Sequence, residues 1–238
     1  MTVRMSSADA GVSRFYTSTD RGHNWNGPYQ LPLFGQPGIM ARTDYLVNGK
    51  EDCTLFLTAS KSNGEEGRPI CARTTDGGKS WQFVSFIGPE PEGFSIMPAT
   101  IRLTDKELLT AVRRREGSKR WIETWLSEDN GASWSFLNVA TPDLGEGNPP
   151  AVIRLKDGRV CLTYGYRQAP FGIRARLSRD GGRTWGEEFI LRDDGGGRDL
   201  GYTRTVQRPD GKIVTVYYFC EQDKGDRYIA ATIWDPGD

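Results

Sequence analysis

Apolar and polar residues alternate along the chain in short runs. The clearest is IRARLS at 173–178, and runs of similar length recur through the rest of the sequence. A period of two residues is typical of a half-buried β-strand, whereas an amphipathic helix repeats its apolar positions every 3.6 residues. Turn sequences such as KDGR at 156–159 separate successive runs, and an Asp-Gly pair between two runs indicates a β-hairpin. The pattern therefore predicts an all-β protein of short antiparallel strands.

One eight-residue pattern, Ser/Thr-x-Asp-x-Gly-x-x-Trp, recurs along the chain. It occupies Ser18–Trp25, Thr74–Trp81, Ser127–Trp134 and Ser178–Trp185, so that successive tryptophans are 56, 53 and 51 positions apart. Each full unit holds four strand-like runs in about 50 residues, with the octad between the third and the fourth. A repeat of four antiparallel strands with this length is the unit of a β-propeller blade.

The octad resembles the Asp-box, or BNR repeat, of the sialidase (neuraminidase) superfamily. The resemblance implies a sialidase-type β-propeller in which each box forms the turn between the third and fourth strands of a blade. It also implies that the Asp and Ser/Thr oxygens bind amides of the turn and that the Trp packs between neighbouring blades. These structural residues would be Asp20, Trp25, Asp76, Trp81, Asp129, Trp134, Asp180 and Trp185. The segments GPEPEGFSIMP, GNPPA and PFGIRARLS are more closely similar to uncharacterised bacterial sialidase-like proteins.

The strand-like runs make three full units, at 39–87, 97–141 and 149–192. Two runs precede these units and three follow them, which gives seventeen strands in all. Because sialidase-type propellers have six blades, we expect residues 1–238 to form a single propeller domain that lacks its N-terminal blade and a half. A fragment or an early-truncated gene product would have this form. The alternative is a ring of about four blades, closed by pairing the N-terminal strands with the last unit. The exposed strand edges of an open ring would favour self-association.

Strand direction predicts which residues lie at the rim opposite the boxes. Since neighbouring strands run in opposite directions, the start of each inner strand and the end of each second strand meet at that rim, near the central axis. These positions hold the residues that we predict to bind substrate: Arg42, Arg113, Arg114, Arg167, Arg204 and Tyr166. Arg42 and Asp44 share one strand face, where burial is costly unless they bind a ligand or form an ion pair inside the channel. Convergent guanidinium groups suit a carboxylate, because their planar donors bind it bidentately.

The resemblance to sialidases implies catalytic roles for some rim residues. The family binds the carboxylate of its sugar with an arginine cluster. It uses a tyrosine nucleophile made more basic by a glutamate, together with an aspartate near the leaving group. The segment GYTRTVQRPDGKIVTVYY at 201–218 is similar to the one that carries the nucleophile, and Tyr202 occupies that position. Arg167 matches a carboxylate-binding arginine.

The remaining catalytic positions depart from the family pattern. Pro149 stands where the glutamate is expected, and Glu146 is the nearest acid that could replace it. Asp44 is the candidate acid near the leaving group, in a later blade than the family uses. The early Phe-Arg-Ile-Pro segment with the first arginine is absent from the sequence. A phenol without a basic partner is a poor nucleophile at neutral pH, so the identity of this partner decides whether the site is active.

Three functions are compatible with these residues. The first is an exo-acting glycoside hydrolase of the exo-α-sialidase type, acting on glycans with a terminal acidic sugar. The second is a propeller glycosidase of other specificity, for example toward arabinan or uronate, which the Arg42–Asp44 pair and the missing glutamate favour. The third is a non-catalytic propeller that binds glycans.

Composition excludes several other classes. Lys+Arg and Asp+Glu each number 31, and this zero net charge does not favour non-specific binding to nucleic acid. No run approaches the roughly 20 apolar residues of a membrane span. The four cysteines form no C-x-x-C pair and lie in apolar runs, so they read as small buried hydrophobic residues rather than metal ligands. The one histidine, His23, lies inside an octad, and we therefore predict neither Ser-His-Asp chemistry nor a metal or cofactor.

The cellular location depends on the true start of the chain. The N-terminal segment MTVRMSSADAGVSRFY lacks the apolar core of a secretory signal. A cytoplasmic protein is expected if Met1 is the true start. A secreted or periplasmic protein is expected if a signal precedes it.

Overall fold

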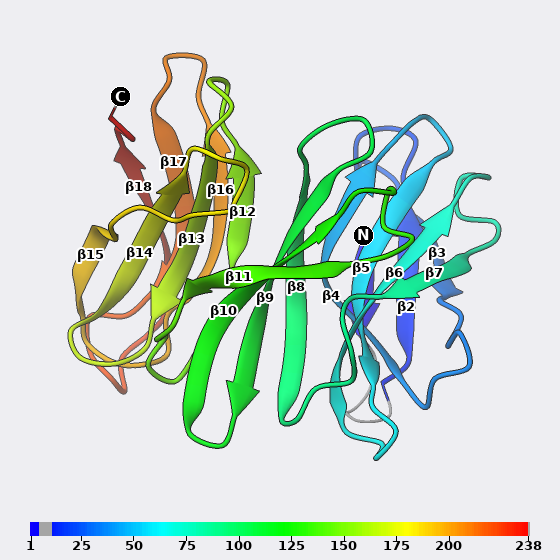
Figure 1. The fold of residues 1–238 in the computed structure, drawn as a ribbon, viewed down its shortest axis with the longest axis horizontal. Helices are drawn as coiled ribbons and strands as arrows, with labels where there is room; N and C mark the ends of the chain where they lie inside the picture. Colours follow the sequence, from blue (N-terminus) through cyan, green and yellow to red (C-terminus); the bar gives the residue numbers. More distant parts are fainter. Residues whose placement is uncertain (5–10, 238) are drawn as a thin grey trace.

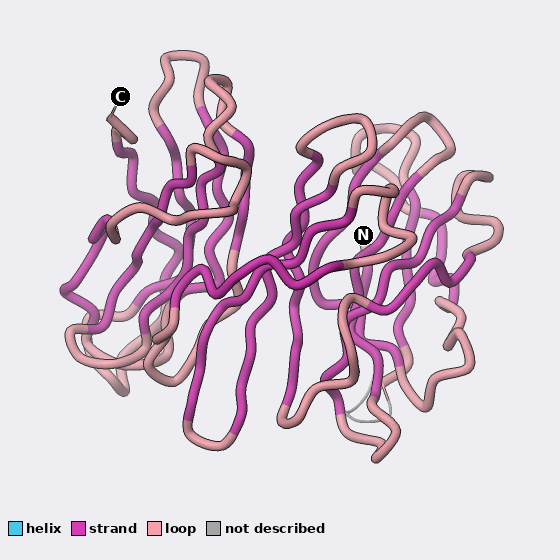
Figure 2. The backbone as a smooth tube through the Cα atoms, in the orientation of Figure 1, coloured by secondary structure: helices cyan, strands magenta, loops and turns pink. Residues whose placement is uncertain are grey.

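The structure is a computed structural model that describes residues 1–4 and 11–237, except for the side chains of Arg4, Arg42 and Thr43. Within these residues the chain consists of strands and loops (Figure 1), and the tube drawing shows strands in all parts of the molecule (Figure 2). The described residues contain no helix of the length and apolar character needed to cross a membrane.

Five antiparallel sheets, which we call blades 1 to 5, follow one another along the chain. Blade 1 contains β1 (Thr2–Arg4), β2 (Ser13–Thr17) and β3 (Asn26–Gln30). Blade 2 contains β4 (Ile39–Val47), β5 (Cys53–Ser60), β6 (Glu66–Thr74) and β7 (Gln82–Phe86). Blade 3 contains β8 (Phe94–Arg102), β9 (Leu108–Glu116), β10 (Lys119–Ser127) and β11 (Ser135–Thr141). Blade 4 contains β12 (Ala151–Arg154), β13 (Val160–Tyr166), β14 (Phe171–Ser178) and β15 (Phe189–Gly195). Blade 5 contains β16 (Gly201–Gln207), β17 (Ile213–Phe219) and β18 (Tyr228–Trp234).

The blades are arranged as in a propeller. In each one, strands adjacent in the sequence pair with each other. Figure 1 shows blades 1 and 2 on the right, blade 3 in the middle, and blades 4 and 5 on the left. The first strands of blades 2 to 5 are the innermost, and β4 contacts β8, β8 contacts β12, and β12 contacts β16. The predicted sialidase-type propeller of three full and two partial blades is therefore confirmed.

The first blade differs from the prediction by one strand. Residues 2–4 pair with β2, with Thr2 opposite Phe15, so the described chain has eighteen strands where the sequence indicated seventeen. Three residues are too few for their alternation to be recognised in the sequence. Blades 1 and 5 are separate sheets, so the alternative of a four-blade ring closed by pairing their strands is wrong.

The box turns have the hydrogen bonds that the resemblance implies. In blade 3 the Ser127 hydroxyl donates to Asp129 Oδ1 over 2.9 Å and accepts from the Gly131 amide over 2.7 Å. The Asp129 carboxylate also accepts from the amide and the hydroxyl of Ser133, over 2.8 Å and 2.6 Å. The other three boxes repeat this set of bonds. Donation from Ser133 holds the pKa of Asp129 below its usual range.

Each box tryptophan of blades 2 to 4 packs on the blade before it. Trp81 lies edge-on to Phe15 with ring centroids 5.7 Å apart, and Trp134 lies edge-on to Phe56 at 6.3 Å. Trp185 packs in the cluster of buried apolar residues between blades 3 and 4. Trp25 in blade 1 instead is 47% exposed and donates its indole N–H to Gly22 of its own turn. Trp81, Trp134 and Trp185 therefore lie between blades, as the resemblance implies.

The cysteines are free thiols. Cys71, Cys161 and Cys220 are buried, and Cys53 is partly buried. Burial raises the pKa of the Cys71 thiol to about 12, which keeps it protonated and unreactive at neutral pH. Cys71 belongs to the apolar cluster between blades 2 and 3, as expected of a small hydrophobic residue.

Replacing Asp129 with Asn tests the role of the box carboxylate. The amide group retains one acceptor and loses the second, so we expect a loss of about 1–2 kcal/mol in the free energy of unfolding at pH 7. The native pKa of Asp129 is depressed, so its stabilisation is present above the unfolded-state value near ~3.9 and disappears as the pH falls through the native value. Urea unfolding of both proteins from pH 7 to pH 3 should show the difference shrinking with acid. A difference independent of pH would contradict this role.

Candidate functional site

The rim opposite the boxes, which we call the site rim, is built from two kinds of connection. One kind joins the second and third strands of a blade, and the other leads to the inner strand of the next blade. Among the described residues these connections are 31–38, 61–65, 87–93, 117–118, 142–150, 167–170, 196–200 and 220–227. Glu146, Tyr166, Arg167 and Tyr202 lie in these connections or within two residues of a strand end, and Arg114 is the third residue from the end of β9. Arg42, Asp44, Arg113 and Arg204 lie further inside their strands.

The inner strands carry β-bulges near the site rim. The pairing register shifts between Met40 and Asp44 in β4, between Ile96 and Ala99 in β8, and between Gly201 and Arg204 in β16. A bulge bends its strand and reorients the side chain of the extra residue. Two of the bulge residues, Met97 and Tyr202, have left-handed backbones with φ of 56° and 51°. This conformation is unfavourable for a bulky residue and persists only where neighbouring contacts enforce it.

Asn148 enforces the backbone conformation at Tyr202. Its side chain is fully buried, and its Oδ1 accepts from the amides of Tyr202 and Gly165 over 2.9 Å and 3.3 Å. Its Nδ2 donates to the Leu200 carbonyl over 3.0 Å. Gly201, at φ +109°, lies so close that a Cβ there would be 2.6 Å from the Asn148 amide atoms. Tyr202 is therefore fixed at its backbone while its side chain stays 45% exposed.

Arg167 and Tyr218 lie beside Tyr202. The Arg167 guanidinium is 5.7 Å from the centroid of the Tyr202 ring, and the Tyr202 and Tyr218 rings are 5.8 Å apart. Arg167 donates from Nε to the Leu200 carbonyl over 3.0 Å and from a terminal nitrogen to the Tyr218 hydroxyl. The result is an arginine and two tyrosines in contact, contributed by blades 4 and 5.

Asp199 completes this group. The Tyr218 hydroxyl donates to Asp199 Oδ1 over 2.7 Å, and Arg227 Nε donates to Asp199 Oδ2 over 3.1 Å. Donation from Tyr218 and the nearby Arg227 and Arg167 charges lower the pKa of Asp199. Burial, assisted by the Asp199 hydrogen bond, raises the pKa of Tyr218, so this phenol stays neutral at physiological pH.

Comparison with known proteins agrees with this architecture. The sequence model of the BNR repeat-like domain matches residues 2–215. The chain belongs to this family. No curated protein matches the chain.

Several solved structures share the propeller fold of this BNR repeat-like chain. A protein of unknown function from Dyadobacter fermentans has a TM-score of 0.79 at 23% identity, over 97% of this chain and 66% of that one. The NanB sialidase from Streptococcus pneumoniae has a TM-score of 0.68 at 17% identity, over 95% of this chain and 36% of that one. The α-L-arabinofuranosidase Arb93A from Fusarium graminearum has 0.59 at 14% identity, over 84% and 63%. The chain thus spans under two thirds of each of these proteins, and the likeness at such identities is one of fold.

Glu146 lies next to Arg167 in this BNR repeat-like propeller. Its amide donates to the Arg167 carbonyl over 3.3 Å, and its own carbonyl accepts from Arg113 over 3.5 Å. Its carboxylate forms an ion pair with Arg198. The segment is therefore near the predicted site, but the carboxylate that we expected to serve Tyr202 is engaged by Arg198.

Adjacent arginines of β9 point in opposite directions. Arg114 forms an ion pair of 3.1 Å with Glu123, which is 5% exposed and also accepts from the indole N–H groups of Trp121 and Trp125. This buried network accounts for the charge of Arg114 without a ligand. Arg113 and Arg115 share the other strand face and lie 5.5 Å and 5.8 Å from the Phe94 ring centroid. Substrate binding stays a prediction for Arg113.

Asp44 and Arg204 lie on inner strands of blades 2 and 5, and they attract each other electrostatically. Asp44 Oδ2 accepts from the Thr100 amide over 2.5 Å, and burial raises the pKa of this carboxyl. The side chain of Arg42 lies outside the described residues, so the expected Arg42–Asp44 pairing stays a prediction. Tyr166 is separate from the Tyr202 group, because its hydroxyl donates to Asp143 over 3.1 Å.

Sequence reasoning missed Asp199, Arg227 and the clamping role of Asn148. The only sequence signal for the first was the charge-rich turn DGGGRDL at 194–200. Among the described residues, no group of three or more His, Cys, Asp or Glu side chains is placed to hold a metal ion. Two surface grooves involve none of the predicted catalytic or substrate-binding residues. One lies by blade 1, and the other is lined by Val47, Asn48, Asp52, Thr54, Arg73, Arg102, Asp105 and Asn130.

A pair of glycine variants tests the Asn148 clamp. Gly201→Ala puts a methyl group 2.6 Å from Asn148, and we expect it to destabilise the protein by about 2–4 kcal/mol through overpacking and backbone strain together. Gly211→Ala is the matched control, since Gly211 has φ +88° and a Cβ added there would meet no atom within 4 Å. Its free energy of unfolding should fall only by the cost of backbone strain, about 1 kcal/mol. Equal losses in urea unfolding would show that Asn148 does not confine residue 201.

Proposed function

We propose that this chain is a sialidase-like glycoside hydrolase acting on glycans with a terminal acidic sugar. The observation that carries the proposal is the placement of Tyr202. Its phenol is exposed at the site rim, its backbone has the left-handed φ of 51°, and the Arg167 guanidinium lies 5.7 Å from its ring. Backbone strain maintained by a buried clamp is a feature that clusters at functional sites.

The charges around Tyr202 suit an anionic sugar. Arg167 and Arg113 supply planar donors for a carboxylate. A carboxylate nucleophile would repel such a substrate, whereas a phenol approaches the anomeric carbon without a charge. In the proposed reaction the Tyr202 oxygen bonds to the anomeric carbon as the glycosidic bond breaks. The leaving oxygen takes a proton from an acid, and water then hydrolyses the glycosyl-tyrosine.

Asp44 is the proposed acid. Burial raises its pKa, which increases the fraction of the carboxyl that carries a proton to donate. Its hydrogen bond from the Thr100 amide fixes the carboxylate on the inner strand. The base for the phenol of Tyr202 is Glu146, which must leave Arg198 for this role.

Tyr218 offers a second assignment of the nucleophile. Its hydroxyl already donates to a carboxylate, that of Asp199, which is the arrangement of an activated nucleophile and its base. The engagement of Glu146 by Arg198 favours a different candidate function, a propeller that binds glycans without cleaving them or that hydrolyses another sugar.

Phenylalanine variants separate these assignments. Fluorogenic sialosides, arabinofuranosides and uronides should be tested for turnover by the protein. We expect Tyr202→Phe to lower kcat on the substrate that is cleaved by at least about a thousandfold, because the attacking oxygen is removed. Tyr218→Phe is the matched control, and it should lower kcat by about tenfold or less through lost positioning.

The opposite ranking of the two variants would assign the nucleophile to Tyr218. Absence of turnover, with binding of sialyllactose retained, would leave only the glycan-binding function. Release of an arabinofuranoside or a uronide, but not of a sialoside, would exclude sialic acid as the substrate.

We further propose that two copies of the chain associate through blade 5. The face of this blade that carries Val206, Val216, Ile229 and Ile233 exposes these side chains by 62%, 37%, 74% and 54%. Val216 pairs with Arg204 in blade 5, and Phe56 pairs with Asp44 at the corresponding position of blade 2. Phe56 is fully buried under Trp134 of blade 3, whereas Val216 is exposed. The proposed occupant of this face is blade 1 of a second copy, whose box tryptophan, Trp25, is 47% exposed. Trp25 would pack on Val216 as Trp134 packs on Phe56.

A charge on the blade 5 face should prevent this association. Ile229→Lys puts an ammonium group on the apolar face, and at 74% exposure it should change the free energy of unfolding by less than about 0.5 kcal/mol. We expect light scattering to show a concentration-dependent dimer of the parent chain and a monomer of the variant. Lys50→Glu, in the turn between β4 and β5 of blade 2, is the control. A parent chain that stays monomeric at high concentration would contradict the proposal.

A further inference from the structure

A polar side chain closes the outer part of the junction between blades 2 and 3. Ser85 of β7, four positions after the box Trp81, accepts from the indole N–H of Trp134 over 3.1 Å. The same hydroxyl donates to the carbonyl of Gly131 in the box of blade 3 over 2.5 Å. One hydroxyl therefore satisfies both the indole donor and the glycine acceptor of the next blade.

The junction between blades 3 and 4 is closed in the same way. Asn138 of β11, four positions after Trp134, accepts from the Trp185 indole over 3.1 Å and donates to the Gly182 carbonyl over 2.6 Å. The repeat thus has a rule. In blades 2 and 3, the fourth residue after the box tryptophan supplies a donor and an acceptor to the following box. Blade 4 has Phe189 at this position, and the blade that follows it contains no box.

Blade 1 breaks this rule. The fourth residue after Trp25 is Tyr29, whose side chain is 47% exposed. The indole nitrogen of Trp81 is closed to solvent and has no hydrogen-bond partner among the described residues. Leaving such a donor unpaired costs about 1–3 kcal/mol.

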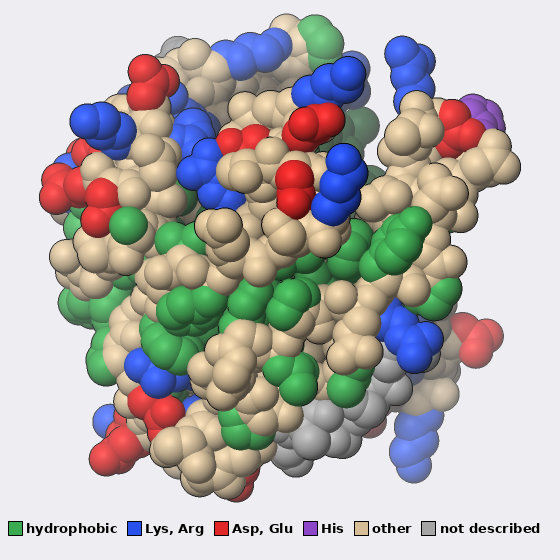
Figure 3. Space-filling view, turned by 90° about the vertical axis from the view of Figure 1, so that its right-hand side faces the viewer, with side chains coloured by type: hydrophobic (Ala, Val, Ile, Leu, Met, Phe, Trp, Pro, Cys, Tyr) green, Lys and Arg blue, Asp and Glu red, His purple; other side chains and the backbone are tan. Residues whose placement is uncertain are grey.

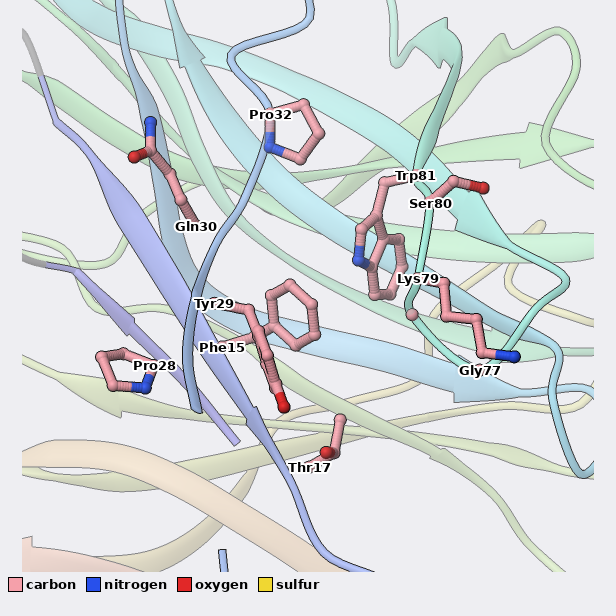
Figure 4. A pocket seen from close by; sticks show the side chains of 11 residues that line it. Phe15, Thr17, Pro28, Tyr29, Gln30, Pro32, Gly77, Lys79, Ser80 and Trp81 are labelled. Atoms are coloured by element: carbon pink, nitrogen blue, oxygen red, sulfur yellow. The ribbon is translucent and has the colours of Figure 1, made fainter. Parts of the chain in front are cut away.

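A groove of about 740 Å³ lies at the junction of blades 1 and 2, where the next two junctions have the hydrogen-bonding side chains of Ser85 and Asn138. Figure 4 shows the rings of Phe15 and Tyr29 close together on one side and the indole of Trp81 across from them. The Phe15 ring lies 5.4 Å from Tyr29 and 5.7 Å from Trp81. Thr17, Gln30, Lys79 and Ser80 add polar groups to the lining. Figure 3 views the molecule from this side and shows apolar side chains gathered between charged ones above and below.

We propose that this groove binds a saccharide, with one sugar hydroxyl taking the part that the Ser85 hydroxyl has at the next junction. A hydroxyl both donates and accepts, so it can pair with the Trp81 indole and the Gly78 carbonyl, the counterpart of Gly131. Aromatic walls with a few convergent polar groups are typical of small-ligand sites and suit the apolar faces of a sugar ring. The indole nitrogen is closed to solvent and the Phe15 ring packs edge-on to Trp81, so the hydroxyl reaches the nitrogen when the Phe15 and Tyr29 rings move aside.

This saccharide site is independent of the proposed hydrolase site. Apart from Pro32 in the connection from β3 to β4, its residues belong to blade 1 and to the box turn of blade 2, and none of them is a residue of the Tyr202 group. Among the described residues that line the groove, Lys79 alone is charged, so the groove accommodates neutral as well as acidic sugars. Its occupation would hold a glycan chain on the protein without taking part in turnover.

The test is to give blade 1 the hydrogen-bonding residue that the next blade has at the same position. Tyr29→Ser gives blade 1 the residue that closes the junction of blades 2 and 3. Saturation-transfer NMR with xylotetraose, arabinotetraose and sialyllactose should detect binding to the Tyr202→Phe protein, in which the proposed nucleophile is absent. We expect adding Tyr29→Ser to weaken that binding at least tenfold and to raise the thermal midpoint.

Two further variants keep the outcome clear. Trp81→Phe retains a ring but removes the donor, and it should weaken saccharide binding even if Tyr29→Ser does not fold. Ser85→Ala opens the next junction instead, so it should lower the thermal midpoint and leave the binding unchanged.

Binding that survives both Tyr29→Ser and Trp81→Phe, or an absence of binding by all three saccharides, would overturn the proposal. So would preferential binding of an extended tetrapeptide. Turnover by the Tyr29→Ser single variant should equal that of the parent, which separates failure of this site from failure of the hydrolase.

Discussion

The packing of each box tryptophan on the preceding blade is the contact on which the rest of the structure depends. A single antiparallel sheet cannot bury both of its faces, and the tryptophan joins the outer part of one blade to the face of the next. Trp134 shows how specific the contact is, because its ring meets Phe56 while its N–H is accepted by Ser85. A box that is held rigid by its own hydrogen bonds presents the indole at a fixed angle. The order and tilt of the blades, and therefore the identity of the rim that gathers arginines and tyrosines, follow from this contact.

The site rim depends on a second constraint, which acts over longer range. The bulge in β16 would leave Tyr202 in an unfavourable backbone conformation unless a contact from outside its blade held it. Asn148, in the connection between β11 and β12, does so by accepting from the Tyr202 amide. Gly165 and Gly201 approach so closely that neither tolerates a side chain. Tight packing beneath the residue and solvent exposure above it give a phenol that is fixed in position and accessible. Arg167 completes this arrangement by spanning from blade 4 to Tyr218 of blade 5.

How far the sequence could predict these features depends on the range of the interactions involved. The boxes were predictable because their hydrogen bonds join residues at most four positions apart, so the spacing of Ser127, Asp129 and Gly131 contains the whole motif. Arg167 and Tyr202 were predictable as rim residues because strand alternation fixes their ends. Asp199 was not, because it lies in a loop without periodicity and its position follows from contacts with Tyr218 and Arg227. Nor could the sequence distinguish Arg114 from Arg113, since the partner Glu123 is identified only by the register of β9 and β10.

Internal repetition makes departures from the pattern informative. A lone tyrosine at an outer strand would carry no meaning in most folds, whereas Tyr29 stands where two other blades have Ser85 and Asn138, each with the same two bonds. With Tyr29 in place of a hydrogen-bonding side chain, the indole N–H of Trp81 is buried without a partner and a groove is open beside it. A residue that served only to pack blades 1 and 2 together would not account for both features. The same comparison identifies the apolar face of blade 5, because Phe56, the counterpart of Val216 in blade 2, is buried. In each case the other blades of the chain serve as the reference that shows what the residue would do if it were only structural.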